Sequence, residues 1–584
     1  MSKYELKPEI EIEGDFSGSH GYDEILKVVT DFLGGIKSER KILAIEGYPG
    51  VDWSELKEKL IGSLEAKTVI YADDFAQSTE LIQERIKDVI TEDRVFGILS
   101  HYTIDQFYQE EKVKEAKKII EGASGLIVVY GFGTTVLTQA DCLIYADLAR
   151  WEIQKRFRYE GLTNWKTDNA AEDALRKFKR GYFFEWRMAD RQKNECFGVT
   201  DFILDTNNKN DPKMIDGAFY RDGVEQASKK PFRLVPYFDA SVWGGHWMEE
   251  HFSLPSNGTN YGWAFDGVPE ENSVILNFND TKIEIPAVNI VFQHPNNLLG
   301  KKVHARFGTE FPIRFDYLDT MGGGNLSLQV HPLVEYAQDK FGIHYTQNES
   351  YYILESTEKS TIYLGVKDGT NREQLVAELE KAAKGDYRFP DEKFINVFPV
   401  KKHDHISIPA GTVHCGGPDT VVLEISATPY IFTFKLWDWE RVGLDGVPRP
   451  VHLEHGEPNL LMDFDKTFCE EQLINRVDEA HDNIATQLGV KTEITGLHEL
   501  EFIETHRHWF KDLVRVCTHD SVNMLNLVEG ESIAVESIDG SFEPFMVNYG
   551  ETFIVPESVG NYIIRNTGSK ENEIAVIQAF VKNL

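Results

Sequence analysis

Four side chains that could bind a metal ion stand close together in the second half of this sequence of 584 residues. They are the amide of Gln329, the imidazoles of His331 and His414, and the carboxylate of Glu349. Two imidazoles and a carboxylate suit a divalent first-row ion such as zinc, with a position left for water or a substrate. The sequence therefore predicts one divalent metal ion per chain, and zinc is the expected ion.

Short strands separated by turns must bring these side chains together. Gln329 and His331 are two residues apart, so on a strand their side chains point to the same face. Glu349 opens the run ESYYILE, which predicts a neighbouring strand, and His414 follows a strand and a proline–glycine turn. A single histidine is more often structural than a ligand, and the chain has 18 of them. The spacing, the carboxylate and the turn together distinguish His331 and His414 from the others.

This arrangement resembles the two-part metal motif of the cupins, which are small antiparallel barrels of the jelly-roll kind. From about residue 230 to the C-terminus, the sequence closely resembles the type I mannose-6-phosphate isomerases. The matching runs are SVWGG (241–245), FPIRFDYLD (311–319), NLSLQVHP (325–332), IPAGTVH (408–414) and KLWDWER (435–441). They occur in the family's order, so the resemblance is specific for the fold and the metal and less specific for the sugar.

The resemblance implies an aldose–ketose isomerase that interconverts mannose 6-phosphate and fructose 6-phosphate through a cis-enediolate. It implies that Ser327 and Trp243 contact the substrate and that Lys435 is catalytic, at a position where the family has an arginine. Lys435 keeps the positive charge but not the bidentate geometry of a guanidinium. Gln347 stands where the family usually has a lysine. The general base is not identified: metal-bound water and a nearby carboxylate are both open.

Two other functions fit the same residues. One is an isomerase of a different sugar, since Gln347 and Lys435 replace cationic groups that the family usually supplies. The other is a cupin that binds a sugar without converting it and acts as a sensor coupled to the N-terminal region. The complete set of four ligands favours the enzyme.

Residues 1–210 predict a different fold, an α/β region with a parallel sheet. A strand at 41–46 leads into the loop GYPGVDWS at 47–54 and then into a helix, which is the order found in a phosphate-binding P-loop. Asp52 and Trp53 occupy the positions of the second glycine and the lysine. The region resembles uridine-kinase-like P-loop proteins only weakly, and we expect no phosphotransfer from it. Docking, oligomerisation and nucleotide sensing are its possible roles.

The sequence predicts a multidomain chain. A linker at 211–231, rich in polar and turn-forming residues, follows the α/β region. A metal-binding cupin domain is expected at 232–495, with a helical insertion at about 367–395. A second, metal-free cupin domain is expected at 496–584. The positions where this last domain would carry ligands hold Asn523, Asn526, Ser558 and Asn561.

The composition restricts the partners. A formal net charge of −34 argues against nucleic acid, because most of the surface would repel phosphates. Five scattered cysteines indicate a reducing compartment rather than a disulfide framework. No signal peptide or membrane-spanning run is recognisable. We therefore expect a cytoplasmic protein whose ligand is a sugar or sugar phosphate, with oligomerisation possible through the N-terminal region.

Overall fold

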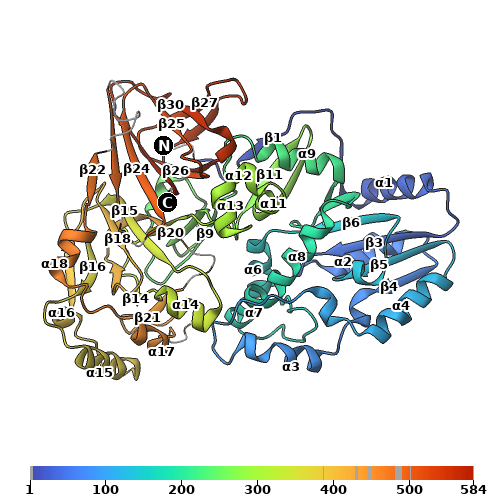
Figure 1. Ribbon diagram of the computed structural model, residues 1–584, viewed down its shortest axis with the longest axis horizontal. Coiled ribbons are helices and arrows are strands. Elements are labelled where there is room, and N and C mark those ends of the chain that lie inside the picture. The colour runs from blue at the N-terminus through green and yellow to red at the C-terminus, as the bar shows by residue number, and fades with distance from the viewer. Residues whose placement is uncertain are drawn as a thin grey trace.

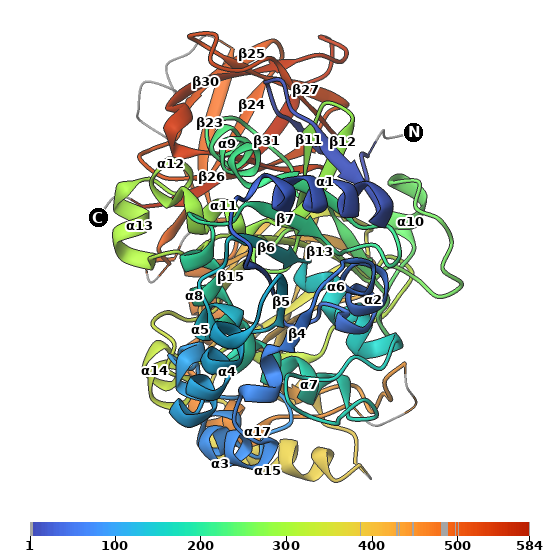
Figure 2. The same ribbon diagram turned by 90° about the vertical axis from the view of Figure 1, so that its right-hand side faces the viewer.

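The computed structural model describes residues 4–582 apart from 386, 428–429, 431, 445, 447–448, 480–488, 497 and 500. In Figure 1 an α/β region lies on the right, the sheets that carry the metal-ligand residues at lower left, and the C-terminal sheets at upper left. Figure 2 shows the same parts from the side of the α/β region. Within the described residues, every helix is too short or too polar to cross a lipid bilayer.

The α/β region is built on a seven-stranded sheet with the order β2-β8-β7-β6-β3-β5-β4. The strands from β7 to β4 run parallel to one another. At one edge of the sheet, β8 pairs antiparallel with β7, and β2 pairs antiparallel with β8. Central strands such as β6 are buried along their whole length, as expected when helices cover both faces. The strands are β2 (Gly18–His20), β3 (Lys41–Gly47), β4 (Thr68–Tyr71), β5 (Leu126–Gly131), β6 (Cys142–Asp147), β7 (Phe202–Asp205) and β8 (Lys213–Asp216).

Amphipathic helices pack around this sheet. In α1, for example, Ile25, Val29 and Leu33 recur every fourth residue and are buried. Two of the helices, α6 and α7, lie between the sheet and the barrel described below (Figure 1). The main helices are α1 (Gly21–Gly35), α2 (Trp53–Lys59), α3 (Thr79–Ile90), α4 (Glu110–Gly122), α6 (Arg150–Tyr159), α7 (Ala174–Arg180) and α8 (Trp186–Cys196). The parallel α/β sheet agrees with the sequence, and the relation to P-loop proteins stays a prediction.

Two antiparallel sheets form the barrel that contains the expected metal ligands. One has the order β18-β15-β20-β13-β10-β9 and the other β17-β16-β19-β14-β21. The first sheet comprises β9 (Tyr237–Asp239), β10 (Trp263–Gly267), β13 (Arg314–Asp319), β15 (Asn348–Ser356), β18 (His405–Ile408) and β20 (Thr420–Ala427). The second comprises β14 (Leu328–Val330), β16 (Thr361–Val366), β17 (Ile395–Pro399), β19 (His414–Gly416) and β21 (Phe434–Trp437).

Helices lie in the connection between the paired strands β16 and β17, where the sequence predicts an insertion. Helix α15 (Arg372–Ala383) begins after Asn371, whose side chain accepts a hydrogen bond from the backbone N–H of Gln374 at 2.9 Å. Leu375 and Leu379 are buried on its inner face. A short helix, α16 (Asp391–Phe394), completes the insertion.

The C-terminal sheets are also antiparallel, with the orders β22-β23-β24-β31-β26-β29 and β25-β30-β27-β28. Asn523 and Asn526 are buried there and hydrogen-bond to backbone and hydroxyl groups. That this part binds no metal stays a prediction. The strands are β22 (Val477–Glu479), β23 (Val490–Thr495), β24 (Ile503–Phe510), β25 (Leu513–Cys517), β26 (Asn523–Glu529), β27 (Ser532–Ser537), β28 (Phe545–Asn548), β29 (Thr552–Val555), β30 (Asn561–Asn566) and β31 (Ile574–Val581).

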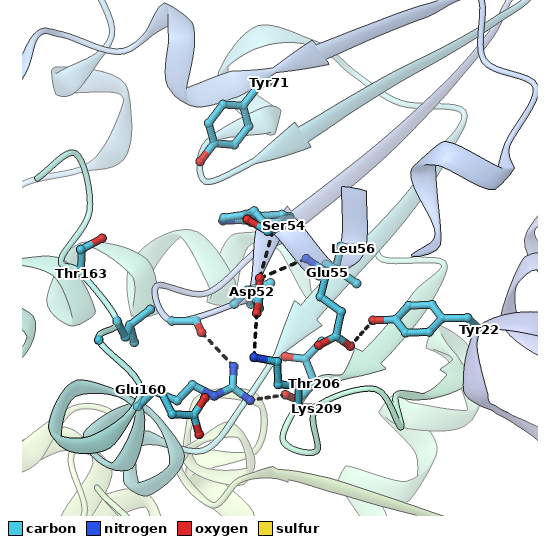
Figure 3. A pocket seen from close by; sticks show the side chains of 16 residues that line it. Tyr22, Asp52, Ser54, Glu55, Leu56, Tyr71, Glu160, Thr163, Thr206 and Lys209 are labelled. Carbon is cyan, nitrogen blue, oxygen red and sulfur yellow. Dashed lines mark hydrogen bonds and ion pairs between the residues drawn. The ribbon is translucent and has the colours of Figure 1, made fainter. Parts of the chain in front are cut away.

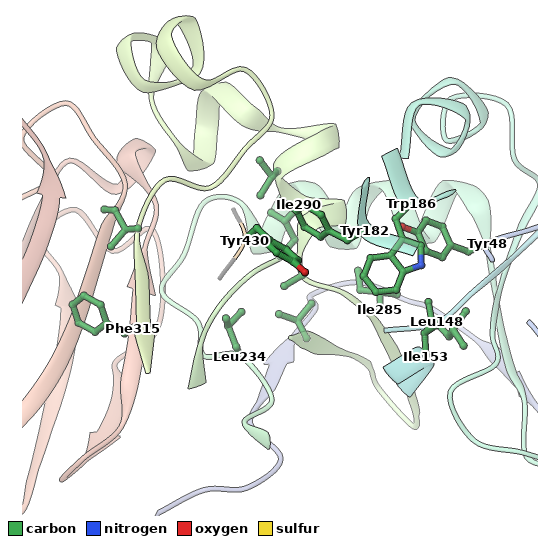
Figure 4. Close-up of a cluster of buried hydrophobic side chains, with 14 of the residues drawn as sticks. Tyr48, Leu148, Ile153, Tyr182, Trp186, Leu234, Ile285, Ile290, Phe315 and Tyr430 are labelled. Atoms are coloured by element: carbon green, nitrogen blue, oxygen red, sulfur yellow. The ribbon is translucent and has the colours of Figure 1, made fainter. Parts of the chain in front are cut away.

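Contacts between these parts are extensive. Strand β1 (Glu9–Glu11), near the N-terminus, pairs in parallel with β11 (Ser273–Phe278), which pairs in turn with β12 (Thr281–Pro286). One hydrophobic core runs from the α/β region into the barrel, and Tyr182 lies against Tyr430 with ring centroids 4.5 Å apart (Figure 4). The domain limits expected at 210, 231 and 495 stay predictions.

Candidate metal centre

Three of the expected ligands converge between the two sheets of the barrel. Glu349 lies on β15 in the first sheet, His414 opens β19 in the second, and His331 directly follows β14. Their ligand atoms all lie within 4.8 Å of one another, and all three side chains are buried. Among the described residues, they form the one such group of histidine, cysteine and acidic side chains.

Hydrogen bonds determine which nitrogen of each imidazole faces the centre. Nδ1 of His331 lies 2.8 Å from the carbonyl oxygen of Phe432, and Nδ1 of His414 lies 2.8 Å from that of Thr412. A carbonyl only accepts, so each Nδ1 carries the proton and each Nε2 presents a lone pair. The two Nε2 atoms lie 3.1 Å and 2.7 Å from Oε1 of Glu349.

This arrangement leaves lone pairs facing one another in a buried space. Nε2 of His331 and Oε1 of Glu349 have no hydrogen-bond partner. A buried polar atom without a partner costs free energy, and a cation placed among these atoms would offset that cost. Burial raises the pKa of Glu349, and positive charge on His331 and His414 would hold it well below its usual range; with both imidazoles neutral, a bound cation would supply that positive charge instead. The donor set fits a divalent metal ion.

Two glutamines adjoin the three ligands. Gln329 lies opposite His414 in the strand register, and its amide nitrogen is 3.3 Å from Nε2 of His414. Turning this amide by 180° would place its oxygen there, and the two orientations are assigned by hydrogen bonding rather than by shape. Gln347 donates to Oε2 of Glu349 at 3.1 Å and accepts from the backbone N–H of Phe432 at 2.9 Å.

The backbone of Phe432 therefore holds the site from two sides, through His331 and through Gln347. The sequence predicts neither the bonds of the Phe432 backbone nor the support that Gln347 gives to Glu349. Gln347 does stand two residues before Glu349, so the two side chains share one face. Such partners behind the ligands orient them and tune their affinity for metal.

Lys435 lies beside the same group. It is opposite Gln329 in the register of β21 and β14, so both side chains project from the same face of the sheet. Burial, together with the positive charges of Arg449, Arg441 and Arg94 and against the effect of Asp438, lowers the pKa of Lys435 to about 8. The structure thus brings together Gln329 and Lys435 as well as the three ligands.

The two residues expected to contact substrate, Ser327 and Trp243, lie in different surroundings. Ser327 is buried directly before β14, on the side of Gln329 by the alternation of the strand. Trp243 is buried too, and its ring packs edge-on against Trp263, with centroids 5.1 Å apart. Trp263 borders a cavity, and contact of Trp243 with substrate stays a prediction.

The degenerate loop of the α/β region borders a separate cleft of about 460 Å³. Asp52 accepts hydrogen bonds from the backbone N–H groups of Ser54 and Glu55 at 3.1 and 3.0 Å, at the start of α2 (Figure 3). Those are the donors that a phosphate would use at a helix N-terminus. Lys209 lies 3.8 Å from the same carboxylate. The carboxylate of Asp52 thus occupies the donors at the start of α2.

Comparisons with known proteins give one match for the α/β region and others for a larger share of the chain. Residues 21–229 match a family described as a domain of unknown function, DUF8485. Mannose-6-phosphate isomerase ManA of Bacillus subtilis is 27% identical over 226 residues, which is 38% of this chain and 66% of that protein. The probable mannose-6-phosphate isomerase GmuF of the same organism is 22% identical over 339 residues, 58% of this chain and 96% of that protein.

A solved structure, the mannose 6-phosphate isomerase from Bacillus subtilis, overlaps 60% of this chain and 99% of its own, with a TM-score of 0.48 and 18% identity. This chain spans 66% of the length of ManA and the same share of a Streptococcus mutans mannose-6-phosphate isomerase, which is 26% identical. The resemblance inferred from the sequence is therefore confirmed: these relatives are mannose-6-phosphate isomerases and support an isomerase at the family level.

Proposed function

We propose that this chain is a metal-dependent aldose–ketose isomerase that interconverts mannose 6-phosphate and fructose 6-phosphate. One observation carries the proposal: the lone pairs of His331, His414 and Glu349 converge in a buried space, next to the cationic strand position of Lys435. The named activity of the curated relatives supports the same reaction.

The residues would divide the work as follows. His331, His414, Glu349 and the amide of Gln329 would hold a divalent ion, preferably zinc. Such an ion supplies Lewis-acid stabilisation of negative charge on sugar oxygens. Lys435 would bind negative charge on the substrate, either on the cis-enediolate or on the phosphate.

A proton must also move between C1 and C2 of the open-chain sugar. Glu424 on β20 lies opposite both Tyr351 on β15 and Asp316 on β13, so these side chains share the face that carries Glu349. Asp316 has a buried carboxylate oxygen without a hydrogen-bond partner. We propose that the proton is carried by one of these two carboxyl groups, Asp316 or Glu424.

Metal analysis combined with an isomerase assay tests the proposal. We expect one zinc ion per chain and conversion of mannose 6-phosphate to fructose 6-phosphate. His331→Ala and His414→Ala should lose both metal and activity, whereas His246→Ala, at an exposed histidine, should keep both. Full metal occupancy in the His331→Ala/His414→Ala double variant would overturn the site. Tight sugar binding without turnover would favour the alternative, a sensor that binds sugar without converting it.

A further inference from the structure

A cavity of about 400 Å³ lies between the α/β region and the first sheet of the barrel. Helices α6 and α7 form one wall, and strands β9 and β10 form the other (Figure 1). Near the start of α6, the backbone N–H of Trp151 donates to the carbonyl oxygen of Glu271 at 3.2 Å, and the Trp151 ring stacks on Tyr237 with centroids 3.7 Å apart. Both parts of the chain therefore build this space, which has the volume of a small-molecule site.

The cavity is separate from the metal centre, although both lie on the same face of the sheet. Side chains directly opposite one another form a row across this face, and Tyr351 at the end of the row stands two residues after the ligand Glu349. Four strand spacings of roughly 4.8 Å separate β9 from β15, about 19 Å along the sheet. Neither the expected metal ligands nor Lys435 border the cavity. The row consists of Tyr237 (β9), Phe265 (β10), Asp316 (β13), Glu424 (β20) and Tyr351 (β15).

Aromatic rings form much of the wall. Tyr237 and Phe265 are stacked with centroids 4.7 Å apart, and Trp263 lies nearly parallel to Phe265 with centroids 5.4 Å apart. Such rings offer broad apolar surface to a ligand. The aromatic side chains that border the cavity are Trp151, Phe157, Phe178, Tyr237, Trp263 and Phe265.

The polar groups at the cavity include both donors and acceptors. Trp151 and Trp263 each have an indole N–H without a hydrogen-bond partner among the described residues. The carboxylates of Asp239 and Glu271 supply acceptors, and the guanidinium of Arg158 supplies donors. An apolar ligand would cover these groups without replacing their bonds to water, which costs free energy. A ligand with hydroxyl groups, each of which can donate and accept, would satisfy them.

The charges around the cavity cancel. Four charged side chains border it, the arginines Arg158 and Arg449 and the carboxylates Asp239 and Glu271. Arg158 pairs with Asp239 at 2.7 Å, and Arg449 pairs at 3.0 Å with Asp438, which a second arginine also contacts. Among the described residues that border the cavity, cations are therefore not in excess. The space suits an uncharged ligand better than a phosphate.

We propose that this cavity binds a neutral sugar ring, an uncharged hexose or hexoside. The C–H groups of the ring lie against the aromatic side chains, and its hydroxyl groups bond to the indole N–H groups of Trp151 and Trp263 and to the carboxylates of Asp239 and Glu271. Because both walls contact it, the sugar links the α/β region to the barrel. Binding here does not require isomerase activity, so failure of the proposed reaction would leave this site standing.

Methyl glycosides test the site, because their rings cannot open and they cannot be isomerised. The methyl α-D-pyranosides of mannose, glucose and galactose are titrated separately into the full chain by calorimetry. We expect at least one of the three to bind with a dissociation constant in the millimolar range or below. If none of them binds, the inference is overturned.

The Trp151→Phe/Trp263→Phe double variant keeps the aromatic rings and loses both N–H donors. Its affinity for the bound glycoside should fall roughly tenfold or more, the effect of losing two neutral hydrogen bonds. Trp509→Phe, which removes an indole that donates to Glu493 in the C-terminal sheets, is the matched control and should bind as the parent does. Unchanged affinity in the double variant overturns the inference. Should that variant not fold, Asp239→Asn, at a side chain 32% exposed, must lower the affinity instead.

The His331→Ala/His414→Ala variant separates the cavity from the metal centre. It should bind the glycoside as tightly as the parent, because the cavity lies away from the ligands along the sheet. Treating the parent with a chelator makes the same comparison without a substitution, and the affinity should again be unchanged. Loss of glycoside binding in either folded, metal-free protein would place the sugar at the metal centre and overturn the inference.

Discussion

Gln347 connects a metal ligand to the backbone beside it. Its amide donates to Glu349 and accepts from the N–H of Phe432, while the carbonyl of Phe432 accepts from His331. A lysine at this position could donate to the carboxylate but could not accept from the N–H group. That buried N–H would then lack a partner, at a cost of roughly 1–3 kcal/mol. The amide therefore suits this backbone better than the family's usual residue.

Replacing Gln347 should weaken metal binding. Gln347→Leu removes both hydrogen bonds, and we expect the affinity for zinc to fall roughly 10- to 100-fold, as for other groups behind metal ligands. Competition with a chromogenic chelator measures this. Gln338→Leu, at an exposed position, is the control. Unchanged zinc affinity in Gln347→Leu would contradict the role of this amide.

Lys435 should matter for catalysis rather than for metal retention. Lys435→Met removes a cation whose bonds to an anionic substrate are worth about 1.5–3 kcal/mol, so kcat/KM should fall at least about tenfold. Lys435→Arg keeps the charge and should retain most of the activity. The exposed Lys340→Met serves as the control, and steady-state kinetics with metal analysis is the measurement. Loss of zinc in Lys435→Met would place this residue with the metal ligands instead.

The ligands and their supports differ in how far the sequence could predict them. Gln329 and His331 are two residues apart and Glu349 opens a strand, so local patterning was sufficient to group them. Phe96 lies more than 200 residues before those ligands, and its contact with Phe432 and Phe434 beside the site depends on how two parts of the chain pack. No local periodicity encodes such packing, and the cavity between the parts could not be predicted.

At the scale of elements, Asp52 and Trp53 determine how helix α2 begins. Asp52 caps the helix with its own carboxylate, and Trp53 lies so close to Gly47 that a side-chain carbon added there would be 2.7 Å from the indole. The parallel strands and the loop after β3 agree with the sequence. The capping hydrogen bonds depend on the side-chain rotamer of Asp52, which a sequence pattern does not specify.

The α/β region should therefore transfer no phosphate from ATP. Asp52 competes for the N–H groups at the start of α2 and repels phosphate, and no lysine replaces Trp53. Radiolabelled ATP with nucleoside and sugar acceptors should give no product above background, with an authentic uridine kinase as the positive control. Turnover that disappears in an Arg156→Met variant, within this cleft, would show that the expectation is wrong.

At the scale of the whole molecule, buried carboxyl groups join the α/β sheet to the rest of the chain. Asp205, at the end of β7, accepts from the backbone N–H of Glu284 on β12 at 2.9 Å and from that of Asn207 at 2.9 Å. Burial and the charge of Glu284 together raise the pKa of Asp205 to about 7, against the hydrogen bonds from Asn207 and Glu284. The interface thus contains a carboxyl group that titrates near neutrality.

Stability should depend on pH through this group. The folded pKa lies above the unfolded value, so the stabilising contribution of Asp205 is complete below about pH 4 and is lost as pH rises through about 7. Asp205→Asn removes the titration. The unfolding temperature of the parent should therefore fall relative to that of the variant from pH 5 to pH 9. Asp211→Asn, at an exposed site, should show no such trend. A constant difference would contradict the assignment.

The pairing of β1 with β11 has a consequence for synthesis of the chain. Glu9 is made before the strands of the α/β region, but its partner Ile275 emerges only after that region has been translated. At about 5–20 residues per second, the first strand waits roughly 13–50 s on the ribosome with an open edge. The α/β sheet has all of its own strands by residue 216 and can form during this interval. The N-terminal strand is thus added late, onto a partly folded nascent chain.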